Sequence, residues 1–382
     1  MVQHSGRGGM YTYTDALCRG LCGIGVEVTV VTSSAWPDGG KPYKVERLFK
    51  ELAAKQNEFS RLHWAADRMS RSMINILRRN KFALDGNFDA VHIQGAGLPL
   101  LDQFFLKTLV KKLPVILTVH DCVSHYERFV SRDSFMRRNL LIPDRLIVHY
   151  ENGKRQLEEL WKIASDKIDV IPHGIIPVDN QPQLADARNK LGLPLDKKIL
   201  LFFGSIRPNK GLDVLLKSLQ DVVRQNSDVL LVIAGAMPRG MSFQPYSDII
   251  KELNLSENVK TFIKFIPDED IDYFLGACDI VVLPYVQFEA QSGVLLRAFT
   301  HKKPVVVSDI GAMGEIVRSE KVGIAVPPGS EESLTYAINN ILKNPRDYES
   351  HYTAELEMKY GWEHISKLTL QCCEKAIAQK KK

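Results

Sequence analysis

The sequence predicts an α/β protein of two domains, each built around a buried parallel sheet. Three observations support this fold class. The chain has 382 residues, more than one ordinary hydrophobic core organises. From residue 198 onwards, short apolar runs alternate with amphipathic segments, the pattern of βα units. The first half repeats this pattern less regularly, and a linker at 175–196 with Pro177, Pro182 and Pro194 separates the halves.

In the first half, apolar runs predict strands at residues 27–33, 88–95, 114–121, 145–150 and 167–174. Residues 10–25 have helical spacing and end at Gly23 or Gly25. Only four residues precede the glycine-rich stretch SGRGGM at 5–10. Either MVQH forms a stub strand there, or the N-terminus has been shortened.

In the second half, we expect strands at 198–204, 229–235, 259–266, 280–285, 304–309 and 322–327. The segments between them have helical spacing: 211–225, 247–254, 268–278, 292–301, 312–319 and 331–343. We therefore assign residues 1–176 to an N-terminal domain and 177–360 to a C-terminal domain. Residues 361–382 form a C-terminal helix that is expected to return to the first domain.

Composition describes an ordinary globular protein, with 45% hydrophobic and 25% charged residues. The net charge of +5 permits an anionic ligand or membrane surface and requires neither, and we expect no nucleic-acid partner. Six cysteines lack a CxxC pair, which favours free thiols over disulfides. No signal peptide opens the chain and no run approaches about 20 apolar residues, so a cytoplasmic location is expected.

Two loops should lie at the same edge of the second sheet, where ligands bind in such folds. GSIRPNKG at 204–211 places Arg207 and Lys210 before a helix N-terminus, where the charges and the helix dipole favour phosphate. A solvated basic loop is the alternative. FEAQSGVLLRAF at 288–299 joins a carboxylate, a Ser-Gly pair and a helix start.

These loops resemble those of retaining glycosyltransferases of the GT-B fold, similar to glycosyltransferase family 4. GSIRPNKGLDVLLKSL matches the diphosphate loop, and FEAQSGVLLRAFTHKKPVVVSDIGAMGEIV matches the donor-sugar loop and the elements after it. FIPDEDIDYFLGACDIVVLPY, IPHGI and GWEHIS also stand at the family's positions. The resemblance covers nearly the whole chain and implies two Rossmann-like domains that face each other across a cleft.

The resemblance implies donor-site roles in the second domain. Arg207 and Lys210 would hold the donor diphosphate, and Glu289 the donor-sugar hydroxyls. The turn at Ile266 and Pro267 would meet the nucleobase. Backbone amides at the start of one helix would contact sugar and phosphate: Ser292, Gly293, Val294 and Leu295.

In the first domain, the resemblance places His120 beside the reacting sugar, which makes His120 and Glu289 the catalytic candidates. Gly8 and Gly9 would approach the donor phosphate. Independently of the resemblance, glycines before a helix start let the backbone come close to an anion, although a plain turn is as good a reading. No metal and no cofactor are implied.

Arg297 departs from the family, which has a second glutamate at this position to hold the ribose. A guanidinium only donates hydrogen bonds and cannot accept from ribose hydroxyls. Three readings remain: Arg297 donates to the ribose oxygens, turns towards the diphosphate, or pairs with a nearby acid. We favour a role in the donor site.

Three features have a structural reading beside a functional one. Acids at 268–270 resemble a metal-binding DxD motif, but their place at a helix start favours capping. His120, Cys122 and His125 lack a fourth ligand at metal-site spacing. His173 is best read as a hydrogen-bonded linker histidine.

The segment 61–82 is a basic amphipathic helix. Its apolar stripe and its arginines lie on different faces, so it is able to lie on an anionic membrane or to pack an ordinary stripe on a core. The stripe consists of Leu62, Ala65, Met69, Met73 and Leu77. The basic residues are Arg61, Arg68, Arg71, Arg78, Arg79 and Lys81.

The expected function is metal-independent, retaining transfer of a hexose from a nucleoside-diphosphate sugar to a hydroxyl of a glycan or lipid-linked glycan. UDP-glucose is the first candidate donor, on family frequency alone. Two alternatives are a GT-B-fold sugar-nucleotide epimerase and a non-catalytic protein that binds sugar nucleotides. The altered position at Arg297 favours the second of these.

Overall fold

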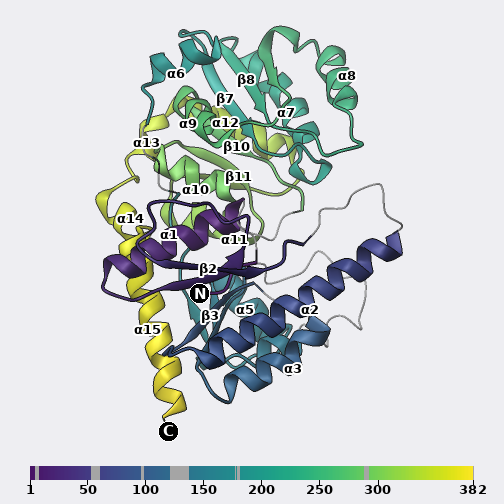
Figure 1. Cartoon of the computed structure of the whole chain (residues 1–382). Helices are drawn as coiled ribbons and strands as arrows, with labels where there is room; N and C mark the ends of the chain where they lie inside the picture. Colours follow the sequence, from purple (N-terminus) through teal and green to yellow (C-terminus); the bar gives the residue numbers. More distant parts are fainter. Residues whose placement is uncertain are drawn as a thin grey trace. The chain divides into compact units, whose positions relative to one another are not determined.

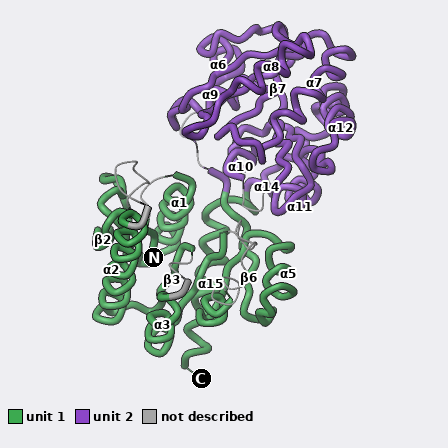
Figure 2. Tube along the Cα trace, turned by 90° about the vertical axis from the view of Figure 1, so that its right-hand side faces the viewer, with its two compact units in different colours: residues 1–174, 358–382 green, residues 175–357 purple. Residues whose placement is uncertain are grey.

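The computed structural model describes residues 1–4, 8–52, 61–95, 99–120, 137–176, 178, 181–287 and 292–381. The chain divides into two compact units (Figure 2). Unit 1 comprises Met1–Gly174 and Met358–Lys382, and unit 2 comprises Ile175–Glu357. These limits lie close to the sequence-based boundaries at 176 and 360. Both units contain a parallel sheet with helices, so the predicted α/β fold class is confirmed.

Unit 2 contains a parallel sheet with the strand order β12-β11-β10-β7-β8-β9 (Figure 1). The strands are β7 (Lys198–Phe203), β8 (Val229–Ala234), β9 (Val259–Phe262), β10 (Ile280–Leu283), β11 (Val305–Ser308) and β12 (Gly323–Val326). The chain adds β8 and β9 on one side of β7, then returns to place β10 on the other. The strand order therefore reverses between β7 and β10, and ligands bind at such a switch point.

Helices cover both faces of this sheet. Leu200 and Phe202 pack with α7 (Leu212–Gln225), α8 (Gln244–Glu252) and α12 (Glu331–Lys343). Phe203 points to the other face, where its ring lies 5.8 Å from that of Phe274 in α9. The remaining helices of unit 2 are α6 (Leu184–Leu191), α9 (Asp268–Ala277), α10 (Gly293–Thr300), α11 (Gly311–Glu320) and α13 (Pro345–Glu349), and α14 (Ala354–Lys359) crosses into unit 1. Burial on both faces explains why the four central strands β7, β8, β10 and β11 are almost continuous apolar runs, whereas the edge strand β9 carries Lys260 and Thr261.

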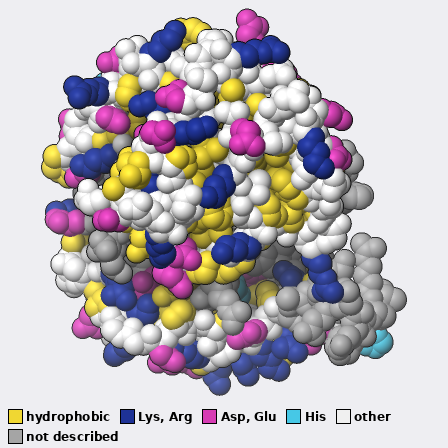
Figure 3. Space-filling view, turned by 90° about the horizontal axis from the view of Figure 1, so that it is seen from above, with side chains coloured by type: hydrophobic (Ala, Val, Ile, Leu, Met, Phe, Trp, Pro, Cys, Tyr) yellow, Lys and Arg dark blue, Asp and Glu magenta, His cyan; other side chains and the backbone are white. Residues whose placement is uncertain are grey.

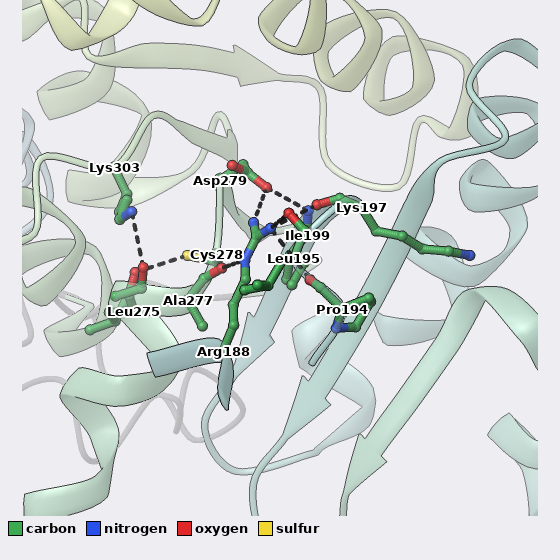
Figure 4. Close-up of polar contacts among 11 residues, drawn as sticks. Arg188, Pro194, Leu195, Lys197, Ile199, Leu275, Ala277, Cys278, Asp279 and Lys303 are labelled. Atoms are coloured by element: carbon green, nitrogen blue, oxygen red, sulfur yellow. Dashed lines mark hydrogen bonds and ion pairs between the residues drawn. The ribbon is translucent and has the colours of Figure 1, made fainter. Parts of the chain in front are cut away.

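Arg188 of α6 forms hydrogen bonds at the amino-terminal edge of the sheet, the edge away from the carboxyl ends of the strands where ligands are expected (Figure 4). Its guanidinium donates to Asp279 Oδ2 at 2.8 Å and its Nε to the carbonyl of Ala277 at 3.0 Å. The same side chain donates to the carbonyl oxygens of Leu195 and Lys197, at 2.9 and 3.1 Å. An arginine that is only 3% exposed is thus paired and hydrogen bonded, as burial of a charge requires. Its place at this edge makes its role structural.

Unit 1 contains the parallel sheet β3-β4-β5-β6 and the parallel pair β1-β2. Val2 forms isolated bridges with Val31 of β1 and Ile93 of β3, so the expected stub strand is reduced to the backbone of Met1, Val2 and Gln3 between these two groups. The strands are β1 (Thr29–Ser33), β2 (Lys44–Phe49), β3 (Val91–Gln94), β4 (Val115–Thr118), β5 (Arg145–Val148) and β6 (Ile168–Val170). β2 was not expected from the sequence.

The C-terminal helix α15 (Trp362–Lys380) packs against α1 (Gly9–Gly23) within unit 1. Gly20 of α1 marks the contact, since a Cβ there would lie 2.3 Å from Ser366 Oγ and 2.9 Å from the carbonyl oxygen of Trp362. Tyr13 and Leu17 of α1 share a core cluster with Ile365 of α15. The remaining described helices of this unit are α2 (Arg61–Asp85), α3 (Pro99–Val110) and α5 (Glu151–Glu159).

The buried face of α2 combines apolar side chains such as Ile76 with several polar ones. Arg79 is 1% exposed and forms a two-bond ion pair with Asp102 of α3, at 2.7 and 3.1 Å. Asn75 accepts from the backbone N–H of Lys50 and donates to its carbonyl, and Asn80 donates to Phe105 O. The predicted apolar stripe of this helix lies only partly in the core. Met69 and Leu77, two of its residues, are 56% and 48% exposed, so the prediction of an ordinary core stripe is wrong for them.

Surface charges are mixed where Figure 3 looks onto the top of Figure 1. Lys and Arg side chains are scattered there among Asp and Glu side chains, around apolar surface.

Among the described residues, no helix combines the length and the apolar character needed to cross a bilayer. The five described cysteines are free thiols, and Cys122 lies outside the described residues.

Candidate functional site

The loops after β7 and β10 are bonded to each other at the switch point of unit 2. The backbone N–H of Val286 donates to the carbonyl of Asn209 at 3.0 Å, and the Asn209 amide donates to Gln287 O at 3.0 Å. Gly211 closes the first loop with a φ of 67°, and a Cβ at this residue would lie 2.0 Å from Pro284 O. Only glycine combines this left-handed conformation with so close an approach. The loop at 204–211 therefore contacts the residues that lead into the second predicted loop, 288–299, at one edge of the sheet.

Lys210 lies over an aromatic ring that the other loop supplies. Its Nζ is 3.4 Å from the centroid of the Tyr285 ring, and Tyr285 is 1% exposed. Burial, followed by the positive charge of Arg207, lowers the pKa of Lys210 to about 7. A bound anion would favour the charged form of Lys210, because a nearby negative charge raises the pKa of an ammonium. Arg207 itself is exposed, with its Nε donating to Ser205 Oγ at 3.2 Å.

The N-terminus of α10 completes the group. Ser292 is the N-cap, and its Oγ accepts from the backbone N–H of Leu295 at 3.4 Å. Tyr285 hydrogen bonds to Ser292, which links the ring beneath Lys210 to the helix start. Within the helix, the first-turn N–H groups of Gly293 and Val294 have no carbonyl four residues earlier to bond. One aromatic side chain thus connects a lysine with a helix N-terminus, two features that favour an anion.

The loop after β9 carries the nucleobase candidates. Ile266 is 7% exposed, and Pro267 is the residue before α9. Phe265, which sequence reasoning missed, is 76% exposed at the same turn. The predicted strand at 259–266 included Phe265, whereas β9 (Val259–Phe262) ends before it and leaves it in the loop.

Arg297 pairs with an acid, as the third of its readings proposed. Its Nη1 lies 3.4 Å from Asp272 Oδ1 of α9, and His301 Nε2 lies 3.0 Å from the same oxygen. The Arg297 and Asp272 side chains are 15% and 18% exposed. Sequence reasoning missed Asp272 because one helix supplies it and another supplies the arginine. A contact of Arg297 with ribose or diphosphate stays a prediction.

The acids at 268–270 occupy the first turn of α9, where they complement the helix dipole. Asp270 also pairs with Lys190 at 2.9 Å. Across the described part of the chain, no group of three or more histidine, cysteine or acidic residues is arranged to hold a metal. Cys122, His125 and Glu289 lie outside the described residues.

The site residues predicted in unit 1 lie at its carboxyl edge and at the start of α1. Gly8 is the residue before α1 and has a φ of 72°, and a Cβ on Gly8 or Gly9 would meet nothing within 4 Å. His120 follows β4. Its Nε2 lies 3.1 Å from Gln94 Oε1 and its Nδ1 lies 3.1 Å from His149 Nε2. Both ring nitrogens of His120 are therefore bonded inside the protein.

His173, read from the sequence as a linker histidine, belongs to unit 1. Its Nδ1 lies 2.7 Å from the carbonyl oxygen of Gly174, and its ring lies 4.7 Å from that of Tyr13. Burial lowers its pKa to about 3, so the ring is neutral at ordinary pH.

Two family models match the chain, one over each unit. Residues 7–178 match the model described as Glycosyltransferase Family 4, and residues 185–355 match Glycosyl transferases group 1.

Two relatives show how far this similarity extends along the chain. A phosphatidyl-myo-inositol mannosyltransferase of Mycobacterium leprae is 27% identical over 372 residues, which cover 96% of this chain and 93% of that protein. An uncharacterized glycosyltransferase of Methanocaldococcus jannaschii is 28% identical over 225 residues, and that alignment covers 57% of this chain and 56% of that protein.

Solved structures of the same fold cover almost the whole chain. Sucrose-phosphate synthase from Thermosynechococcus elongatus has a TM-score of 0.75 at 21% identity and covers 99% of this chain and 96% of its own. An Anabaena protein in complex with UDP-glucose has a TM-score of 0.68 at 16% identity, covering 98% and 97%.

Proposed function

Since the chain belongs to the GT-B-fold glycosyltransferases of family 4, we propose that it transfers a hexose from a nucleoside-diphosphate sugar to an acceptor hydroxyl with retention. UDP-glucose is the first candidate donor. The Anabaena protein with UDP-glucose has the same fold, which supports testing this donor before others.

The observation that carries the proposal is the joined loop pair of unit 2. Lys210, with its ammonium 3.4 Å from the Tyr285 ring centroid, and the start of α10 are linked through Tyr285 and Ser292. A diphosphate bound there would lie beside the Lys210 ammonium, the exposed Arg207 and the first-turn N–H groups of α10. These groups would stabilise the charge that develops on the leaving nucleoside diphosphate.

The proposed mechanism needs no metal. In a front-face reaction the bond between the anomeric carbon and the diphosphate oxygen breaks as the acceptor oxygen bonds to the same face of the sugar. The acceptor proton passes to the leaving phosphate, so no protein nucleophile is required. We assign Glu289 to the sugar hydroxyls and Ile266 with Pro267 to the nucleobase, as the resemblance implies.

The acceptor is proposed to be a hydroxyl of a glycan or a lipid-linked glycan. One relative is named for mannosyl transfer to phosphatidyl-myo-inositol, and others are named D-inositol 3-phosphate glycosyltransferases. These names support a polyhydroxylated, phosphate-bearing acceptor as the first to test.

Peripheral contact with an anionic membrane is proposed for α2. Met69 and Leu77 are exposed, and Arg68, Arg78 and Lys81 are exposed on the same helix. Apolar side chains beside cations suit the boundary of an anionic bilayer. Sedimentation with phosphatidylserine vesicles should fall for Met69→Ser/Leu77→Ser, and binding equal to that of the wild type would contradict the contact.

Proton NMR of the reaction with UDP-glucose and inositol phosphate, in excess EDTA, tests the function. We expect an α-configured product, because retention preserves the anomeric configuration. Metal-dependent turnover, rescued by manganese, would restore the metal reading of Asp268 and Asp270. UDP release with an altered sugar and no acceptor product would favour the epimerase, and intact donor would favour a binding protein.

A further inference from the structure

A chain of polar groups crosses the carboxyl edge of the sheet in unit 1. It runs from His92 and Gln94 of β3 to His120 after β4, His149 after β5 and Ile171 after β6. His92, Gln94 and His149 are buried, whereas His120 keeps part of its surface exposed. We call these five residues the histidine chain. His120 is its one member that the resemblance assigns to the reacting sugar.

The Ile171 end fixes the direction of the hydrogen bonds. His149 Nδ1 lies 3.0 Å from the Ile171 carbonyl oxygen, which only accepts, so His149 carries a proton on Nδ1. In the neutral ring the other nitrogen, Nε2, is then an acceptor. His149 Nε2 lies 3.1 Å from His120 Nδ1, so His120 donates from Nδ1 and keeps a lone pair on Nε2.

The His92 end gives the same direction independently. His92 Nδ1 is buried and has no hydrogen-bond partner among the described residues. An orphaned buried N–H is rarer in proteins than an orphaned acceptor, so the His92 proton belongs on Nε2. That nitrogen lies 2.7 Å from Thr118 Oγ1 and 3.2 Å from the Gln94 amide group, and it donates to both.

Gln94 must then present its carbonyl oxygen to His92 and its amide nitrogen to His120. The side-chain amide of Gln94 therefore has the flipped orientation, with its oxygen and nitrogen exchanged, which its nearly symmetric shape allows. This orientation gives up the weak contact of the amide nitrogen with Met1 Sδ at 3.1 Å. With this orientation, each hydrogen-bond donor between His92 Nε2 and Ile171 O faces an acceptor.

Neutral rings are what the surroundings favour. Burial lowers the pKa of His92 to about 3 and that of His149 to about 4. The pKa of His120 is also held well below its ordinary value, by burial first and then by its histidine neighbours. The Tyr13 ring, 4.9 Å from His120, is neutral as well, since burial raises its pKa.

We propose that His149, held by the Ile171 carbonyl, is a positioning residue that fixes His120 as the tautomer with its proton on Nδ1. The catalytic consequence rests on the proposed function: His120 would meet the sugar as a fixed ring whose Nε2 is occupied by Gln94. His120 then orients the substrate through its exposed surface and does not exchange a proton with it. The tautomer of His120 does not depend on the proposed function, because it follows from hydrogen bonds among residues of unit 1.

The test is a long-range ¹H–¹⁵N spectrum of the full chain labelled with ¹⁵N-histidine, at neutral pH. We expect His120 and His149 to be protonated on Nδ1 only and His92 on Nε2 only. A His120 proton on Nε2, or on both nitrogens, would overturn the proposal. Because this spectrum needs no variant and no substrate, it remains decisive if the chain proves to have no transferase activity.

Three variants separate positioning from mere packing. His149→Phe removes the acceptor, so the His120 proton should move to Nε2, and kcat should fall about tenfold without a change in KM for the donor. His149→Gln offers an amide oxygen near the same place and should restore both the tautomer and kcat. His173→Phe, in the same aromatic cluster but not bonded to His120, should leave the tautomer unchanged. An unchanged His120 spectrum in folded His149→Phe would also contradict the proposal.

Discussion

The ammonium of Lys210 lies 3.4 Å from the centre of the Tyr285 ring, and this contact joins the loop after β7 to the loop after β10. A lysine that is partly buried against a ring and next to Arg207 has part of its hydration removed and a like charge nearby. Its pKa near 7 is the result. A diphosphate bound beside Lys210 would raise this pKa, because a nearby negative charge favours the charged ammonium.

Replacing this lysine should weaken nucleotide binding without unfolding unit 2. Lys210→Ala removes a charge-assisted contact worth about 1.5–3 kcal/mol, and calorimetry with UDP should show that loss. Lys217→Ala is the matched control, since Lys217 pairs with Glu331 on the surface of the same unit. UDP affinity unaffected by Lys210→Ala would remove this lysine from the phosphate site.

UDP binding should take up a proton above neutral pH. The pKa of Lys210 is about 7 in the free protein, and a bound diphosphate raises it. Affinity should thus be unaffected by this group below about pH 7 and fall as pH rises above it, by at most tenfold per pH unit. Calorimetry at pH 8 in buffers of different ionisation enthalpy measures the uptake. Lys210→Arg stays charged and should abolish it; equal uptake by both proteins would locate the proton elsewhere.

The close approach at Gly211 should be intolerant of a side chain. Gly211→Ala would strain a φ of 67° and drive a Cβ towards Pro284 O, so both thermal stability and UDP affinity should fall. Gly240→Ala provides the control, because Gly240 has a φ of 81° and nothing within 4 Å of a Cβ. It carries the conformational strain without the collision. If the two variants lose UDP affinity equally, the loop junction does not shape the site.

Arg297→Glu should harm the donor site although it restores the family's residue. It replaces an attraction to Asp272 by a repulsion, so thermal stability should fall, and adding Asp272→Asn should recover it. At about 6 Å and an effective dielectric of about 20, the lost attraction to a diphosphate is on the order of 2–3 kcal/mol.

Uridine separates the remaining readings of Arg297, because it has the ribose without the phosphate. We expect the double variant Arg297→Glu/Asp272→Asn to lose more affinity for UDP than for uridine. Equal losses would assign Arg297 to the ribose. Unchanged affinity for both would leave only its pairing with Asp272.

The sequence predicted an element best where the residues of that element alone reveal its structure. The buried strands of unit 2 are apolar on both faces, so each reads as a continuous run such as Lys198–Phe203. β2 (Lys44–Phe49) was missed because half of its residues are charged and only Phe49 is buried. The burial of polar residues on α2 was missed because Arg79 is acceptable in a core only beside Asp102, which another helix supplies.

The same distinction holds for the candidate site. Lys210 was found from its own loop, but Tyr285 beneath it and Asp272 beside Arg297 are contributed by distant segments. The histidine chain was missed although its signal was present. A polar residue stands at or just after each of three successive strands of one sheet, as Gln94, His120 and His149 do.

Hydrogen–deuterium exchange tests the location of the donor site most directly. It is measured with and without a nucleoside diphosphate, namely the one that binds most tightly in a calorimetric screen. We predict slower exchange at 204–211 and at 292–295, the two segments that Tyr285 links. The exposed surface of α7 and α12 around Lys217 and Glu331 should exchange unchanged. Protection confined to other segments at saturating nucleotide, with none in these two, would contradict the account.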